Sequence, residues 1–209
     1  MRVLVIDTCL AACQVGLFDD GRMIASVSEA MERGHQERLA PMAQQVLAEA
    51  GGRYDRIAVT VGPGSFTGLR VGLAFAKGLR LATGKTLVGL GTLAGLAASA
   101  APEGPTAGVI DARCGQVYVQ VFEGARALTD PDVLPLAEAA MSLQALGRAP
   151  IVLAGSGASA LAELLPGSRA ASLAAPDLAT LGRLAAVADV HGDVRPLYLR
   201  APDARPMPA

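Results

Sequence analysis

The segment Val59–Leu79, with the sequence VTVGPGSFTGLRVGLAFAKGL, constrains the fold of this 209-residue chain more than any other. A β-branched apolar run leads into a glycine-rich turn, and a helix that extends to about Thr83 follows. Gly68, Gly72 and Gly78 lie inside this predicted helix, where each glycine costs about 1 kcal/mol relative to alanine. A helix that keeps three glycines is expected to pack closely against another backbone.

The neighbour in this close contact remains open. Gly68, Gly72 and Ala76 recur every four residues on one helix face, as small residues do where two backbones approach closely. The contact is either with this chain's own sheet or with a partner chain. In the second case the helix predicted over Glu37–Ala50, which has one apolar face and starts close to Leu39 because of Pro41, also contributes. The predicted partner surface consists of Leu39, Met42, Ala43, Val46, Leu47, Gly68, Leu69, Gly72, Leu73 and Ala76.

Two nucleotide-binding motifs are approached but not matched. Gly62, Gly64 and Gly68 are spaced one residue too widely for the dinucleotide fingerprint. The tripeptide Gly84-Lys85-Thr86 resembles the end of a P-loop, but Gly78 comes one position too early and a helix precedes it. The sequence therefore predicts neither a dinucleotide fold nor a P-loop.

Strands and helices alternate along the rest of the chain. Arg2–Thr8 is a buried strand, and Asp20-Gly21 marks a hairpin, so three antiparallel strands open the protein. The other predicted elements are a strand at Tyr54–Gly62, a hairpin within Ala107–Glu123, a helix near Pro135–Leu146, a strand at Pro150–Gly155, a helix from Ala158, a helix at Asp177–Val190 and a last strand at Val194–Arg200. We expect an α/β protein with a first lobe at 1–103, a smaller second lobe at 104–200 and a proline-rich tail at 201–209.

Three short segments have the character of a phosphate-binding scaffold. Two acids follow apolar strands that lead into hairpins, which also makes an internal duplication plausible, and a glycine-rich turn precedes a helix. In this order they indicate the two-lobed fold of actin-like ATPases. The alternatives are that the acids cap helices or hairpins and that the turn is an ordinary tight turn. The candidate nucleotide cleft consists of Asp7, Thr8, Asp111, Arg113, Gly155 and Gly157.

Composition argues against several classes of function. His35 and His191 are the only histidines, and the three cysteines show no CxxC spacing, so we predict no metal site and no disulfide framework. The net charge is −1 without a basic stripe, which makes direct binding of nucleic acid unfavourable. No signal peptide and no stretch of roughly 20 uncharged apolar residues is found. We therefore expect a cytoplasmic protein that does not enter membranes.

Several of these segments together resemble the TsaB (YeaZ) family. They are VLVIDT with its DDGR hairpin, HQERLAPMAQQVL, GPGSFTGLRVGLAFAKGL, VIDARCGQVYV and RPLYLR, which run in order over nearly the whole chain. The glycine-rich segment is the most specific and the AGSG turn the least. The tail PDARPMPA departs from the family, whose members often have more lysine there.

The resemblance implies an actin-like (ASKHA, ribonuclease-H-like) fold with a reduced second lobe. It implies a non-catalytic scaffold that pairs with TsaD, the paralogue that transfers the threonylcarbamoyl group to the adenosine next to the anticodon of tRNA, and that helps to recruit the ATPase TsaE. Pairing uses the two helices above, and the isolated chain forms a homodimer through them. Neither metal nor tightly bound cofactor is expected; ATP acts only at the level of the complex, and tRNA is contacted indirectly. On this view Gly72→Leu blocks pairing but leaves the monomer folded.

Two other functions stay open. One is an ATP-dependent small-molecule kinase of the same fold that uses Asp7 and Asp111, although a second lobe of about a hundred residues is small for a closed nucleotide cleft. The other is a metal-dependent peptidase, which the missing histidine pair argues against.

Overall fold

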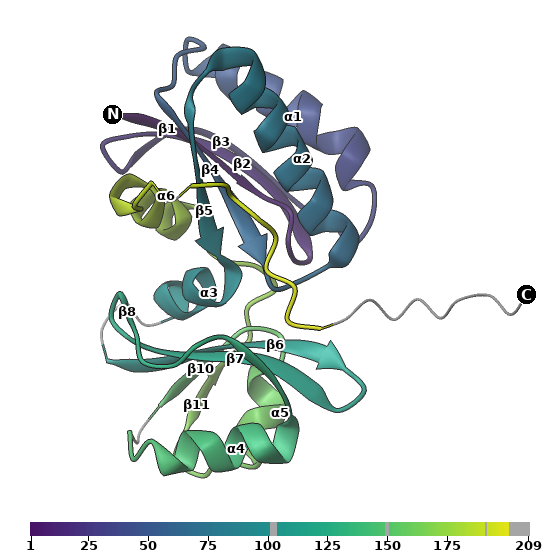
Figure 1. The fold of residues 1–209 in the computed structure, drawn as a ribbon, viewed down its shortest axis with the longest axis vertical. Helices are drawn as coiled ribbons and strands as arrows, with labels where there is room; N and C mark the ends of the chain where they lie inside the picture. The colour runs from purple at the N-terminus through teal and green to yellow at the C-terminus, as the bar shows by residue number, and fades with distance from the viewer. Residues whose placement is uncertain (101–103, 149–150, 191, 201–209) are drawn as a thin grey trace, which may run out of the picture.

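The computed structural model describes residues 1–100, 104–148, 151–190 and 192–200, which form two α/β lobes stacked end to end (Figure 1). The predicted tail at 201–209 lies outside the described residues. The sheet of the first lobe has the order β3-β2-β1-β4-β5. Its elements are β1 (Arg2–Asp7), β2 (Ala12–Asp19), β3 (Arg22–Ala30), α1 (His35–Glu49), β4 (Arg56–Gly62), α2 (Phe66–Thr83) and β5 (Thr86–Gly91).

Strand β1 explains why this sheet is covered on both faces. It pairs antiparallel with β2 and parallel with β4, and every residue from Val3 to Asp7 is buried. Because successive side chains point to opposite faces, Leu4 and Ile6 enter the core under α1 and α2, whereas Val3 and Val5 enter the core under α6. Figure 1 shows the sheet between these two helical layers.

The second lobe repeats this plan on a smaller scale. Its sheet has the order β11-β10-β6-β7-β8, and β9 pairs with β7. The elements after β5 are α3 (Thr92–Ala100), β6 (Pro105–Arg113), β7 (Gln116–Glu123), β8 (Arg126–Ala127), β9 (Asp132–Pro135), α4 (Leu136–Ala145), β10 (Val152–Ala154), α5 (Ala158–Glu163), β11 (Arg169–Ala171) and α6 (Leu178–Val187). The path β7-β6-β10-β11 has the same parallel and antiparallel relations as β2-β1-β4-β5, as an internal duplication would give.

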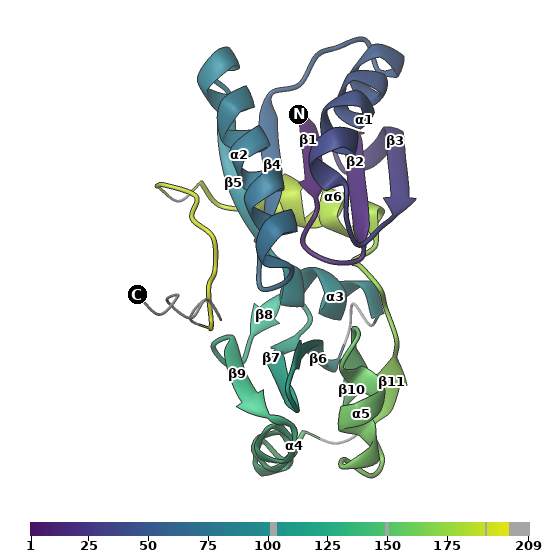
Figure 2. The ribbon, with the colours of Figure 1, turned by 90° about the vertical axis from the view of Figure 1, so that its right-hand side faces the viewer.

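The last helix of each half packs on the sheet of the other half. Helix α3 follows β5 but buries Leu93, Leu96 and Ala97 against β6 and β7 of the second lobe. Helix α6 follows β11 but packs on β1 and β2, with Gly182 against the ring of Phe18. Figure 2 shows α6 behind the first sheet and α3 between the lobes. A division of the chain at residue 103 therefore separates the two sheets but not the helices that cover them, because α3 packs on the second sheet and α6 on the first.

Two predicted elements differ from the structure. Helix α1 begins at His35 rather than near Leu39, so Pro41 lies inside it and removes one helical hydrogen bond. Burial of the apolar face of the helix in the core compensates for that loss. The segment Val194–Arg200 is not a strand; it makes one backbone hydrogen bond to β4, from Leu197 N–H to the Val61 carbonyl at 2.8 Å. We call residues 193–200 the C-terminal strap.

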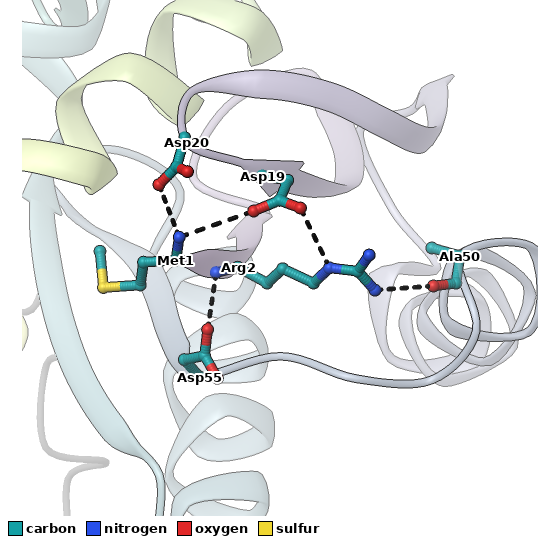
Figure 3. A network of polar contacts seen from close by, with 6 residues as sticks. All are labelled: Met1, Arg2, Asp19, Asp20, Ala50 and Asp55. Carbon is teal, nitrogen blue, oxygen red and sulfur yellow. Dashed lines mark hydrogen bonds and ion pairs between the residues drawn. The ribbon is translucent and has the colours of Figure 1, made fainter.

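A network of polar contacts fixes the start of β1 (Figure 3). The terminal ammonium of Met1 contacts Asp20 and lies 3.6 Å from Asp19, at the turn between β2 and β3. The Arg2 N–H donates to Asp55, and the Arg2 guanidinium bridges Asp19 and the carbonyl of Ala50 at the end of α1. One short segment thus ties together a hairpin, a helix end and the loop before β4.

We expect opposite effects of alanine at two helical glycines. A Cβ on Gly182 would overlap the buried ring of Phe18, so Gly182→Ala should lower the free energy of unfolding by about 1–3 kcal/mol. A Cβ on Gly78 of α2 would meet open space, so Gly78→Ala should raise it by about 0.5–1 kcal/mol. Urea unfolding measures both, and equal effects would contradict the proposed packing of α6.

Candidate functional site

A cleft of about 740 Å³ lies between the two lobes. The first lobe contributes residues 9–11 after β1 and residues 63–66 before α2. The second lobe contributes residues 110–113 of the hairpin between β6 and β7, and the C-terminal strap contributes residues 197–200. Of the six residues predicted for a nucleotide cleft, Asp111 and Arg113 line this cleft, whereas Asp7, Thr8, Gly155 and Gly157 are not among its lining residues.

Asp7 is sealed beneath this cleft rather than lining it. Its side chain is fully buried, and its Oδ1 accepts hydrogen bonds from Thr60 Oγ1 at 2.6 Å and from the Cys9 N–H at 3.1 Å. Its Oδ2 accepts from Gln14 Nε2 at 3.2 Å. Thr8 is also buried and donates its hydroxyl to the Gly68 carbonyl at 2.7 Å. These hydrogen bonds within the chain occupy the Asp7 carboxylate and the Thr8 hydroxyl, which the sequence analysis places in a nucleotide cleft.

Burial raises the pKa of Asp7. Removal from water raises its pKa above the ordinary value of 3.8, while the hydrogen bonds from Thr60, Cys9 and Gln14 and the nearby His35 lower it. The pKa stays raised because desolvation is the largest of these effects. The ionised carboxylate therefore destabilises the folded state relative to its protonated form.

Asp111 and Arg113 do reach the cleft. Both are exposed at the hairpin between β6 and β7, and Asp111 Oδ1 accepts a hydrogen bond from the Arg113 N–H at 2.8 Å. Arg113 and Cys114 adopt left-handed conformations, with φ of 64° and 52°, which turn the chain sharply at the cleft. Asp7 and Asp111 therefore do not form the predicted acid pair, because one is enclosed and the other is at the surface.

The glycine-rich turn between β10 and α5 has a structural role. The Gly155 N–H donates to the Ala171 carbonyl at 3.0 Å, and the Gly157 N–H donates to the Val109 carbonyl at 3.1 Å. A Cβ on Gly155 would overlap the same Val109 carbonyl. Both glycines therefore allow close packing on β6, and their N–H groups are not free to bind a phosphate.

The predicted partner surface on α1 and α2 faces the chain's own core. Nine of its ten residues are buried, and the tenth, Leu47, is partly buried against the same core. A Cβ on Gly68 would overlap the Thr8 carbonyl, and one on Gly72 would overlap the Thr8 hydroxyl. Of the two open interpretations, packing on the chain's own sheet accounts for these glycines. Gly72→Leu would damage the core and cannot test an interface, which corrects the expectation of a folded monomer.

The opposite face of the two helices is open. On α2 it presents Arg70, Ala74, Gly78 and Leu81, and the side chain of Leu81 is 88% exposed. On α1 the exposed residues include Ala40, Gln44 and Ala48. This exposed face of α1 and α2 is mostly small or apolar at its centre, which allows close approach of another helix.

Sequence reasoning missed a cluster at the mouth of the cleft. The Arg70 guanidinium lies 3.7 Å from the centre of the Phe66 ring and donates to the Tyr198 hydroxyl at 2.9 Å. Arg200 donates to the Ala112 carbonyl, which links the strap to the second lobe. Ser156 also lines the cleft, where its hydroxyl accepts from the Asp111 N–H. The sequence predicts a strand at RPLYLR, and no local pattern indicates these long-range contacts.

Other potential sites are not found in the described part of the chain. There, no three His, Cys, Asp or Glu side chains gather to hold a metal ion. Within the same residues no helix is both long and apolar enough to cross a membrane. Cys9 and Cys13 are buried, and Cys114 is exposed.

Comparison with known proteins gives the family. A family model described as TsaD, tRNA N6-adenosine threonylcarbamoyltransferase, matches residues 25–174. The TsaB protein of Bacillus subtilis is 30% identical over 98% of this chain and 96% of its own length. The TsaB protein of Escherichia coli is 40% identical over 56% of this chain, and the match spans about half, 53%, of the length of that relative.

Solved structures agree with the architecture. YeaZ from Pseudomonas aeruginosa superposes with a TM-score of 0.82 at 30% identity, covering 94% of this chain and 99% of that one. A ROK hexokinase from Thermus thermophilus shares the fold, with a TM-score of 0.53 at 18% identity over 90% of this chain and 98% of that one. The two lobes with exchanged helices are thus an actin-like (ASKHA) fold, as predicted. Within this class, the chain belongs to the TsaB (YeaZ) family, which is related to TsaD.

The three thiols should differ in reactivity. Burial raises the pKa of Cys9 to about 12 and that of Cys13 to about 11, so neither forms a thiolate at neutral pH. A thiol titration with Ellman's reagent should detect only Cys114 in the folded chain and all three cysteines in denaturant. Cys114→Ser should abolish the native reaction; rapid labelling of that variant would contradict the burial of the other two.

The raised pKa of Asp7 should make its effect on stability depend on pH. An ionised buried carboxyl costs stability, and this cost is relieved as the pH falls through the folded pKa toward the unfolded value. The unfolding free energy of the wild type, relative to Asp7→Asn, should therefore increase from about pH 8 to about pH 4. Chemical unfolding at several pH values measures the difference. A decrease on acidification would mean that the folded carboxyl has a depressed pKa instead.

Proposed function

We propose that this chain is a non-catalytic subunit that pairs with a TsaD-type protein in the synthesis of threonylcarbamoyladenosine in tRNA. Its membership of the TsaB family gives the pathway. One observation supports the non-catalytic role. Asp7 and the N–H groups of Gly155 and Gly157, which were candidates for nucleotide binding, already form hydrogen bonds within the chain. A catalytic cleft of this fold would need such groups free.

The same observation argues against a small-molecule kinase. An acid that activates a hydroxyl must come within hydrogen-bond distance of it, and Asp7 is enclosed by Thr60, Cys9 and Gln14. Asp111 is exposed at a hairpin. Among the residues that line the cleft, the other acid is Glu32. ATP is expected to act at the level of the assembled complex, in which this chain helps to recruit TsaE.

Pairing is assigned to the exposed face of α1 and α2. Ala74 and Gly78 leave room for a partner helix to approach closely, and Leu81 supplies an apolar side chain that the chain itself does not cover. The core packing of Gly68 and Gly72 holds α2 in place beneath this face. In the absence of its partner, the isolated chain forms a twofold dimer through the same face. tRNA is contacted through the complex.

A matched pair of charge insertions tests this interface. Ala74→Arg places a long cation at the centre of the exposed face, and Ala137→Arg makes the same change on an exposed position of α4. Ala74→Arg should weaken binding to TsaD by about tenfold or more, since it desolvates a charge in an apolar contact. Ala137→Arg should bind normally. Light scattering gives self-association, and titration calorimetry with the TsaD of the same organism gives affinity.

Activity completes the test. Threonylcarbamoyl transfer by TsaD, TsaE and this chain should fall with Ala74→Arg and persist with Ala137→Arg, while both variants keep the unfolding transition of the wild type. Normal pairing by Ala74→Arg would refute the interface. Transfer that proceeds equally well without this chain would refute the proposed function itself.

A further inference from the structure

Charged residues are distributed unevenly over the first lobe. The chain has a net charge of −1, but no acid occurs in the sequence between Asp55 and Glu103. This part of the chain has five basic residues, which are Arg56, Arg70, Lys77, Arg80 and Lys85. Arg56 is used within the fold, where it donates to two backbone carbonyls at the end of α6. The other four lie on α2 or directly after it.

Three of these cations lie on the side of α2 that faces the C-terminal strap. Arg70, Lys77 and Arg80 follow one another at spacings of seven and three residues, which places them along one side of a helix. Arg70 donates to the Tyr198 hydroxyl and Lys77 lies 3.3 Å from Asp193, so this side borders the strap, as Figure 2 shows. We call Arg70, Lys77, Arg80, Lys85 and Arg195 of the strap the basic strip. The sequence shows no such strip, because these residues come together only in the fold.

Much of this positive charge is not neutralised within the described part of the chain. There, the acid in contact with the strip is Asp193, which lies 3.3 Å from Lys77 and 3.1 Å from Arg195 and is shared between them. Arg80 and Lys85 are exposed, and among the described residues their side chains form neither a hydrogen bond nor an ion pair. Cations gathered in this way repel one another and attract a polyanion.

Arg70 is held in a defined orientation at one end of the strip. Its guanidinium lies 3.7 Å from the centre of the Phe66 ring, and its Nε donates to the Tyr198 hydroxyl at 2.9 Å. Its two Nη groups donate to no acceptor among the described residues, and a planar guanidinium with parallel donors matches the oxygens of a phosphate. Phe66 and Tyr198 are 45% and 46% exposed, and exposed rings of this kind stack with unpaired RNA bases.

An RNA backbone fits the strip better than an acidic protein does. Arg70 and Arg80 are about 15 Å apart along the helix axis, a length over which a nucleic-acid strand presents several phosphates. An acidic peptide supplies negative charge but no bases for the exposed rings. The TsaB family acts in the modification of tRNA, so a suitable RNA is present in the pathway.

We propose that the basic strip binds the phosphate backbone of tRNA directly, within the complex that modifies it. The net charge of −1, which predicts indirect contact, averages over the whole surface and does not report where the cations gather. This proposal rests on the proposed function for the identity of the RNA and adds a contact made by this chain itself. Arg80 and Lys85 are outside the residues assigned to pairing, so they are the ones to change.

Two double variants test the strip. Arg80→Gln with Lys85→Gln removes its two unpaired cations, and Arg126→Gln with Arg169→Gln removes the same charge from exposed positions of the second lobe. Each is titrated with an in vitro transcript of a tRNA that carries the target adenosine, as the isolated chain at low salt and as the pair with TsaD. The strip variant should bind about tenfold more weakly, and the slope of log affinity against log salt should fall by about 1–2. The control should match the wild type.

Unchanged tRNA affinity of the strip variant, or equal weakening by the control, would overturn the proposal. Weaker binding of TsaD by the strip variant, measured by titration calorimetry, would place Arg80 and Lys85 in a protein interface and would also contradict it. If the wild-type chain does not pair with TsaD, the proposed function fails, and the titration of the isolated chain then decides the role of the strip by itself.

Discussion

The close contact between α2 and the segment that follows β1 is the constraint on which the rest of the structure depends. Thr8 donates its hydroxyl to the Gly68 carbonyl, and the Ser65 N–H donates to the Cys9 carbonyl at 2.7 Å. Side chains on Gly64, Gly68 or Gly72 would collide with the Cys9 carbonyl, the Thr8 carbonyl or the Thr8 hydroxyl, respectively. This contact covers Asp7, which is fully buried beneath Cys9. It also fixes the floor of the interlobe cleft and the outward face of α2.

The fold could be predicted largely from local signals and the site only in part. The continuous apolar run of β1, the Asp20-Gly21 turn and the glycine-rich turn before α2 are local signals, and the structure has all of them. The exchange of α3 and α6 between lobes depends on contacts such as Phe18 with Gly182, which are far apart in sequence. The same limit applies to the Phe66, Arg70 and Tyr198 cluster.

The predicted interface shows why glycine patterns are ambiguous. The spacing of Gly68 and Gly72 correctly indicates a close backbone neighbour, but periodicity does not identify it, and the neighbour is Thr8. The apolar face of an amphipathic helix is by default the face that its own core covers. A partner must then use the remaining side chains, which on α2 are small or apolar enough to permit it. Likewise, an acid after a buried strand can be a solvated ligand or, as Asp7 is, an enclosed acceptor of hydrogen bonds.

The exchanged helix α6 has a consequence for synthesis on the ribosome. The first sheet is complete once β5 ends at Gly91, yet the face formed by Val3, Val5 and Phe18 packs against α6, which ends at Val187. A nascent chain therefore carries an apolar sheet face without α6 while the residues between Gly91 and Val187 are made. The first lobe begins before the second and is completed after it, so this face is available to a chaperone during that interval.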